Sequence, residues 1–576
     1  MKKTNIIEQI QGACKKASCD LVIKNISIVD VFGQDTYVGD VAIKGGYIVG
    51  IGEYSAEVEL DGSGKYICPG LIDAHAHIES SLTTPTEYYK AALLHGITTM
   101  ICDPHEIANV LGEEGIKLMI ELSEGLPVDF NFMLPSCVPS TSFENSGAVL
   151  KSKDLLPLYN EERVLGLAEV MDSPAVLNCD DDMIEKILDA RNKGLTIDGH
   201  GAGFGLDEIN AYCTAHIRTD HECHSTSEVI DRIRRGMYVL IREGTVAKNL
   251  KELIKVANIE KSRRLCFCTD DKHIDDLISN GSIDSSIRVA IDYGLNPETA
   301  IQMATLNSAE CYKFVDKGAI APGYKADFII LDDLNKFKIE SVYKDGKLVM
   351  KNGEIKFKEV ANNAIVKFDN SINIPHLNKD SFKIDLKEKL NVIEIIPNKL
   401  ESNHLIINTK EHNLGDVFKS SVEKDLLKVA VVERHNNLGN IGLGVLKGIK
   451  IQSGAIATTI AHDSHNMIVC GQNDDDMIFA VEKLKELGGG IIVVNNKQVL
   501  ASIKLEVGGL ITARPSAEVV TELHELHKAI EVIAPSINFN PFLTLSFLSL
   551  PVIPELKITD KGIFNVKEFK FIPLSE

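Results

Sequence analysis

The sequence has no run of about 18 apolar residues, the length that a membrane-spanning helix requires. Its first residues, MKKTNIIEQIQGACKK, contain no apolar stretch long enough for a signal peptide. The usual signals for insertion into a membrane, or for export across one, are therefore missing. We expect a cytoplasmic protein with no membrane partner.

Basic residues are in deficit. The chain has 61 Lys and Arg against 82 Asp and Glu, a formal net charge of −21. Because a surface of this sign repels polyanions, we expect no nucleic-acid partner. A small neutral or cationic molecule is favoured instead.

Two classes of motif are also missing. The 12 cysteines form no C-x-x-C pair, which argues against a thiolate zinc site, and the chain has no Gly-rich dinucleotide or P-loop motif. Many of the cysteines lie inside apolar strand-like runs, as Cys68, Cys102 and Cys266 do. We expect them to be reduced core residues.

What the chain does contain is an ordinary globular composition, with 44% hydrophobic and 25% charged residues among 576. Short β-branched stretches lie within residues 21–68 and return near 318–358. These distant segments are predicted to pair into one small β-sandwich. Residues 1–68 and 317–370 would be its two halves, interrupted by an inserted domain.

The insert, residues 69–316, alternates eight apolar strand candidates with amphipathic helices. This alternation predicts an α/β fold with a (β/α)8 TIM-like barrel, although a doubly wound open sheet fits nearly as well. Residues 371–419 are lower in pattern and richer in Asn and Lys, and we interpret them as a connection. Residues 420–576 are predicted to form a separate C-terminal α/β domain.

Histidines and carboxylates gather at the ends of the predicted barrel strands. His75 and His77 stand at i and i+2 on the first strand, so both rings point to the same side and can reach one ion. In a barrel, four further side chains would converge on the same mouth. The predicted metal ligands are His75, His77, Glu169, His200, His221 and Asp270.

These six nitrogen and oxygen ligands exceed the need of one tetrahedral ion. Two metals that share Glu169 as a bridge, with a hydroxide between them, fit better. Asp270 would hold that hydroxide and take its proton, so the predicted reaction class is metal-assisted hydrolysis. Core histidines satisfied by backbone groups are the competing interpretation.

Several segments carry a family resemblance. PGLIDAHAHIESS, GLAEVM, DGHGAG, TDHE and CTDD, flanked by a split β-sandwich, resemble the amidohydrolase superfamily. DPHEIANV and the later IAHDSHN are similar to the bacterial adenine deaminase family. The resemblance implies that a purine base, adenine, is hydrolysed to hypoxanthine and ammonia. It implies two Mn²⁺ per chain, with Fe²⁺ or Zn²⁺ as alternatives, and we further expect a homo-oligomer, a dimer or larger.

The chain departs from the superfamily in two places. Strand four offers Glu169 where many members have a carboxylated lysine. Many deaminases of the superfamily have a proton-donating glutamate three residues after the strand-five histidine, but this position is Gly203 here. We consider Glu222 and Glu79 as the catalytic proton donor, each close to a predicted ligand, and prefer Glu222.

Two further clusters are candidates for substrate binding. His105 and Glu106 follow the second strand in a D-P-H-E segment, which fits a simple helix start equally well. His462 and His465 lie in an H-D-S-H segment of the C-terminal domain, which also fits a solvated loop. We expect this segment to face the metal site and exclude water, with His465 as the preferred contact.

Two other functions stay open at this point. One is an amidohydrolase that acts on another cyclic amide or on an N-acyl substrate. The other is a non-catalytic scaffold of the same fold. The scaffold is disfavoured because such relatives lose ligands, whereas all six positions are filled here.

Overall fold

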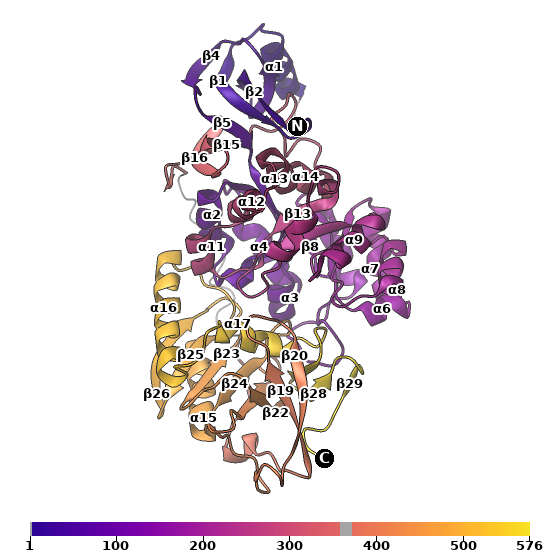
Figure 1. Cartoon of the computed structure of the whole chain (residues 1–576), viewed down its shortest axis with the longest axis vertical. Helices are drawn as coiled ribbons and strands as arrows, with labels where there is room; N and C mark the ends of the chain where they lie inside the picture. Colours follow the sequence, from indigo (N-terminus) through magenta and orange to yellow (C-terminus); the bar gives the residue numbers. More distant parts are fainter. Residues whose placement is uncertain (1–2, 358–370) are drawn as a thin grey trace.

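Figure 1 shows the computed structural model, which describes residues 3–357 and 371–576. An N-terminal sheet, a barrel and a C-terminal domain follow one another along the long axis, with the barrel in the middle. Within the described residues, no helix is long and apolar enough to cross a membrane. The 12 cysteines are free thiols, and nine of them are buried as predicted, whereas Cys14 and Cys179 are exposed and Cys213 is half-buried, so the prediction of core residues is wrong for these three.

The N-terminal sheet joins two segments that are distant in the sequence. Strands β5 and β15 pair antiparallel, from Pro69 opposite Phe328 to Tyr66 opposite Leu331, and Ile28 packs with Phe328 in one buried cluster. The predicted pairing is confirmed, although the strands form one continuous nine-stranded sheet. Residues 358–370 of its predicted second half lie outside the described residues. After helix α1 (Lys3–Ala13), the sheet contains β1 (Cys19–Asp30), β2 (Asp35–Lys44), β3 (Tyr47–Ile51), β4 (Ala56–Asp61), β5 (Tyr66–Pro69), β15 (Phe328–Asp333), β16 (Lys338–Lys344), β17 (Lys347–Lys351) and β18 (Glu354–Ile355).

The barrel strands lie at the eight predicted positions. Most are buried along their whole length, as β13 is with the sequence LCFC, because helices cover one face and packed side chains fill the other. The strands are β6 (Leu71–His77), β7 (Ile97–Cys102), β8 (Asp129–Leu134), β9 (Val164–Val170), β10 (Thr196–Gly199), β11 (Thr219–Asp220), β12 (Tyr238–Arg242) and β13 (Leu265–Cys268).

A short continuation of the last strand joins it to the first. Strand β14 (Asp270–Asp271) pairs parallel with β6, with Asp270 opposite Ala76 and Asp271 opposite His77. The open doubly wound sheet is thereby excluded and the barrel-like fold is confirmed, although β10 and β11 are not paired, so that the strands fall into a sheet of six and a sheet of three. The pairing also brings the last strand's carboxylates beside the first strand's histidines.

Helices follow most of the strands and cover the outside of the barrel. One of them, α9, begins with a capping box, in which Ser225 and Glu228 satisfy each other's backbone N–H groups. The covering helices include α2 (Pro85–Leu94), α3 (His105–Leu111), α4 (Glu113–Leu122), α7 (Asp181–Asn192), α8 (Leu206–Thr214), α9 (Thr226–Arg234), α12 (Ile283–Asp292), α13 (Pro297–Ala304) and α14 (Leu306–Cys311).

The C-terminal domain is built on an eight-stranded sheet with the order β20-β19-β22-β21-β24-β23-β25-β26. Helices α15 (Asp474–Leu487) and α16 (Ser516–Ile533) pack against it. The strands are β19 (Lys389–Ile395), β20 (Ser402–Asn408), β21 (Leu427–Val432), β22 (Ile441–Lys447), β23 (Ala455–Thr458), β24 (Met467–Gly471), β25 (Gly490–Asn495) and β26 (Gln498–Lys504), with β27 (Leu556–Thr559), β28 (Gly562–Asn565) and β29 (Lys570–Phe571) in a separate small sheet.

Residues 371–419 are not only a connection. They contain β19 and β20, so this part of the prediction is wrong. Strand β20, with the sequence SNHLIIN, is the edge of the sheet and is only partly buried. An edge strand does not need the apolar alternation by which a strand is recognised in a sequence.

The C-terminal domain lies against the mouth of the barrel. Thr512 donates its N–H to the carbonyl of Leu82 at 3.0 Å and accepts the N–H of Thr84 at 3.1 Å. Ser464 Oγ donates to Glu144 Oε2 at 2.7 Å. Helix α17 (Pro541–Ser546) lies at the boundary between the two parts in Figure 1.

Candidate metal and substrate site

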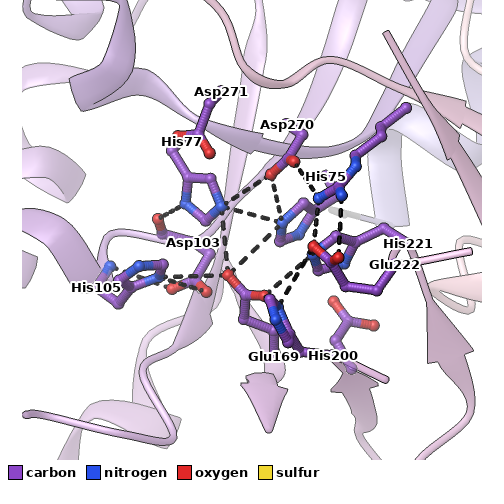
Figure 2. A network of polar contacts seen from close by, with 12 residues as sticks. His75, His77, Asp103, His105, Glu169, His200, His221, Glu222, Asp270 and Asp271 are labelled. Atoms are coloured by element: carbon purple, nitrogen blue, oxygen red, sulfur yellow. Dashed lines mark hydrogen bonds and ion pairs between the residues drawn. The ribbon is translucent and has the colours of Figure 1, made fainter. Parts of the chain in front are cut away.

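The six predicted ligands come together at the barrel mouth. Each lies in the last three residues of a barrel strand or within two residues after one, and none is more than 6% exposed. Figure 2 shows their side chains converging. The sequence therefore placed these six side chains correctly in one cluster.

The first group of ligand atoms comes from β6 and β14, with one oxygen of Glu169. The Nε2 atoms of His75 and His77 are 3.1 Å apart. Asp270 Oδ1 lies 3.6 Å and 3.3 Å from these two atoms. Glu169 Oε1 lies 3.9 Å and 3.4 Å from them. Four ligand atoms thus converge on one point.

The second group uses the other oxygen of Glu169. His200 Nδ1 lies 2.7 Å from Glu169 Oε2, and His221 Nε2 lies 3.1 Å from it. Each carboxylate oxygen therefore faces a different set of imidazoles. A carboxylate that bridges two ions requires this arrangement.

The backbone around Asp270 is fixed by a buried carboxylate. Asp73 accepts both the N–H and the hydroxyl of Thr269, at 3.0 Å and 2.6 Å. Asp270 itself has a φ of 55°, in the left-handed region that non-glycine residues seldom adopt. Such a conformation persists only where the surroundings hold it, which is common at functional sites.

The donor set fits divalent cations. His77 Nδ1 donates to the carbonyl of Asp103 at 3.0 Å, which leaves the Nε2 lone pair free to bind a metal. His200 Nε2 and His221 Nδ1 are buried and have no hydrogen-bond partner among the described residues. Nitrogen and oxygen donors without thiolate suit manganese, iron or zinc.

The electrostatics favour cations as well. Burial raises the pKa of Glu169 and of Asp270. The imidazoles that face these carboxylates lower both pKa values, Arg242 lowers that of Asp270 further, and together they outweigh burial. Both pKa values are therefore held well below the usual range. Two buried ionised carboxylates are attractive to metal ions.

Arg242 was not predicted, and it changes the role of Glu222. Its guanidinium binds both oxygens of Glu222 and also donates to Asp270 Oδ2 at 2.9 Å. Burial raises the pKa of Glu222, but Arg242 together with His200 and His221 outweighs burial and lowers the pKa to about 2. The ion pair with Arg242 disfavours Glu222 as a proton donor.

Glu79, the second predicted donor, faces away from the site. Its Oε1 accepts the N–H of Ile107 in the first turn of α3 at 3.1 Å, and burial raises its pKa to about 7. Its side chain is absent from the lining of the cavity. The position is that of a carboxylate beside a helix N-terminus.

The predicted substrate contacts form a second buried cluster. Glu106 lies between His462, whose Nδ1 is 2.5 Å from Oε1, and His465, whose Nε2 contacts Oε2. His105 links this cluster to the metal ligands, because its Nδ1 is 3.7 Å from Glu169 Oε1 and its Nε2 is 3.6 Å from Asp463 Oδ1.

Residues of both clusters line one cavity. His462 and Asp463 line it, whereas His465 does not, so the cavity favours His462 over His465 as the contact. His465 lies behind Glu106 because it follows a tight turn that starts at Ala461. The cavity belongs to a domain interface, where ligand sites commonly form.

The roof of the cavity is apolar and comes from the C-terminal domain. The ring of Phe547 stacks on His462 with centroids 4.2 Å apart. No spacing in the sequence pointed to these residues, whereas the arginine that ends the apolar run YVLIR could have pointed to Arg242. The roof residues are Leu400, Phe547, Leu550 and Ile553.

Comparisons with known proteins agree with this architecture. Residues 66–349 match the Amidohydrolase family, and residues 402–570 match the Adenine deaminase C-terminal domain. The chain is 50% identical to an adenine deaminase of Geobacillus kaustophilus, over 98% of each chain. It is 48% and 47% identical to adenine deaminases of Bacillus pumilus and Bacillus subtilis, over the full length of each chain. By its length, its two matched domains and these identities, the chain belongs to the adenine deaminase family.

Proposed function

We propose that this protein hydrolyses adenine to hypoxanthine and ammonia at the barrel mouth. The observation that carries the proposal is the pair of ligand groups that share Glu169 and open into the cavity lined by His462. Hydrolytic deamination needs an activated water beside a buried heterocycle. Full-length similarity to proteins named adenine deaminase supports adenine as that heterocycle.

The metal is proposed to be Mn²⁺, two per chain, with Fe²⁺ and Zn²⁺ as alternatives. His75, His77 and Asp270 would hold one ion, His200 and His221 the other, and Glu169 both. When bound, such ions make water acidic enough to act as a nucleophile near neutral pH. We further propose a cytoplasmic homo-oligomer.

The protein's own residues orient the water and the base. Asp270, whose second oxygen is held by Arg242, would accept a proton from the attacking water and pass it to the departing amino group. The roof around Phe547 would exclude bulk water, so that ring nitrogens bind protein donors without competition. Glu106 and His105 would contact the base or support its contacts.

A substrate panel tests the proposal. Purified Mn²⁺-loaded protein is assayed against adenine, guanine, cytosine, adenosine and dihydroorotate. We expect hypoxanthine and ammonia from adenine, and a kcat/KM for adenosine about 100-fold lower, because the relatives that the chain matches over their full length are named adenine deaminases. Turnover of dihydroorotate in place of adenine would favour a cyclic amide substrate.

A further inference from the structure

Attack of water on the carbon that bears the amino group drives an electron pair onto the neighbouring ring nitrogen. That nitrogen needs a proton from a nearby acid, which in enzymes contributes roughly 10²–10⁴-fold to the rate. The titratable groups that line the cavity, apart from the metal ligands, are His105, Glu106, Glu222, Asp271, His462 and Asp463.

Three of these groups are each held by another side chain. Both oxygens of Glu222 accept hydrogen bonds from the two terminal nitrogens of the Arg242 guanidinium. Asp271 accepts the hydroxyl of Ser80. His105 donates its Nδ1–H to Asp103 at 3.0 Å and turns its Nε2 toward two carboxylates. Among the described residues, His105 Nε2 and Asp463 Oδ2 also have no hydrogen-bond partner, but these two side chains face each other, with His105 Nε2 3.6 Å from Asp463 Oδ1.

The hydrogen bonds around Glu106 fix the protonation of two histidines. The N–H of Ala461 donates to His465 Nδ1 at 3.2 Å, so the proton of a neutral His465 is on Nε2, which donates to Glu106 Oε2. The other oxygen of Glu106 accepts Nδ1–H of His462. Of the four ring nitrogens of His462 and His465, only Nε2 of His462 has no hydrogen-bond partner among the described residues.

The same tautomers argue against a third metal at this cluster. A neutral His465 whose Nδ1 accepts a backbone N–H has no lone pair left on Nε2 for an ion. Glu106 therefore acts as a hydrogen-bond acceptor between two imidazoles. A carboxylate behind an imidazole is the arrangement that orients a histidine for acid–base work.

His462 Nε2 is buried and has no hydrogen-bond partner among the described residues. The ring is only 2% exposed, lines the cavity and is held by stacking on Phe547. Burial lowers its pKa, but the carboxylate of Glu106 outweighs burial and raises the pKa to about 9. Asp271 and Asp463 act in the same direction, while His465 and His273 oppose it.

We propose, on the basis of the proposed deamination of adenine, that His462 of the C-terminal domain protonates the purine ring, with Glu106 and His465 as positioning residues. One water is consumed. Its oxygen bonds to the ring carbon while the carbon–nitrogen π pair moves onto the ring nitrogen, which takes the proton of His462 Nε2. The second proton of the water, now on the new hydroxyl, passes through Asp270 to the amino group. The amino group leaves as ammonia with the electron pair of the broken carbon–nitrogen bond. The proton released when the next water is activated returns to His462.

The test starts with the wild-type protein, whose adenine turnover and metal content are measured first. If the wild-type protein does not deaminate adenine, the proposed function fails, and the role of His462 is then judged with the substrate that is turned over. His462→Asn should lower kcat by about 10²–10⁴-fold with the wild-type metal content, and free imidazole should restore part of the rate. His404→Asn, in β20 and hydrogen-bonded to Asn391, is the matched control and should behave as wild type.

Glu106→Gln keeps the shape of the cluster but removes its charge. Because the donor must be protonated, we expect the alkaline limb of the kcat–pH profile to move to lower pH by one unit or more. A His462→Asn variant with kcat within tenfold of wild type would overturn the proposal. The proposal would also be overturned if imidazole did not restore the kcat lost in His462→Asn and if, in addition, the alkaline limb of the kcat–pH profile of Glu106→Gln stayed where it is in the wild-type protein. If His462→Asn does not fold, the position of the alkaline limb in the kcat–pH profile of Glu106→Gln is the measurement that decides whether the proposal holds.

Discussion

Single side chains in this site serve two neighbours at once. Glu169 turns one oxygen to each group of imidazoles, and Arg242 holds Glu222 and Asp270 together. Such sharing makes each residue hard to replace, because a substitution leaves a second buried group without its partner.

Asp270→Asn tests the proton acceptor. The amide keeps the shape of the side chain but cannot take a proton from water, so we expect turnover to fall below 10⁻³ of wild type, within the range for loss of an acid–base group. Far-UV circular dichroism should be unchanged, and metal analysis should show whether ions are retained. Near-normal kcat in this variant would contradict the assignment.

Arg242→Met tests the buried ion pairs. The change leaves the carboxylates of Glu222 and Asp270 without their cation, and we expect the free energy of unfolding of the metal-free protein to fall by about 3–5 kcal/mol. Urea unfolding measures it. Adding Glu222→Gln should recover part of the loss. Arg235→Met, at the partly exposed end of α9, is the control, and an equal loss there would contradict the explanation.

Among the elements, the short strands decide the chemistry. Strand β14 has two residues, yet it closes the barrel and sets Asp270 beside the histidines of β6. The roof is made by irregular chain around α17, which is positioned from behind by β27. Lys557 of β27 donates to the carbonyls of Leu400 and Phe547, at 2.7 Å and 3.0 Å.

Lys557 predicts a pH dependence of stability. Burial lowers its pKa to about 7 in the folded state, from 10.5 in the unfolded chain. Between these two values the unfolded state binds more protons, so this residue makes the free energy of unfolding rise with pH from about 7 to about 10.5. Lys557→Met should flatten this rise and stabilise the protein most at pH 7 and below. Urea midpoints at pH 6, 7, 8 and 9 measure it, with the exposed Lys528→Met as control. A slope equal to wild type in Lys557→Met would contradict the prediction.

At the scale of the whole molecule, the C-terminal domain completes the site. It supplies His462, Asp463 and the roof to a cavity whose floor is the barrel. The contacts of Thr512 and Ser464 fix it over the mouth. The barrel alone would leave its ligands open to bulk water.

A chain that ends at residue 357 tests this. We expect kcat for adenine to fall at least 100-fold, because the truncated protein lacks both the proposed ring donor and the cover that excludes water. Phe547→Ala is a milder variant that opens the roof, and KM for adenine should rise about tenfold, the effect of losing about 1.4 kcal/mol of apolar contact. A truncated protein that folds and keeps full activity would contradict the role of the domain.

The barrel and the cluster of six predicted ligands could be inferred from the sequence alone. The periodicity of apolar residues predicted the positions of all eight strands. The cluster of ligands was predicted from the H-x-H geometry and from the rule that barrel sites form at the carboxyl ends of the strands. These signals are local, so they can be read along the chain. Edge strand β20 was missed for the same reason, because it lacks the apolar alternation by which a strand is recognised locally.

Only the tertiary structure decided which carboxylates can hold a proton and which histidine reaches the cavity. Glu222 is adjacent to a ligand in the sequence, but its protonation is set by Arg242, 20 residues away. Glu106 meets His462 across 356 residues. A pKa depends on burial and on charges within a few ångströms, and these are fixed by packing between domains, which no spacing along the chain records.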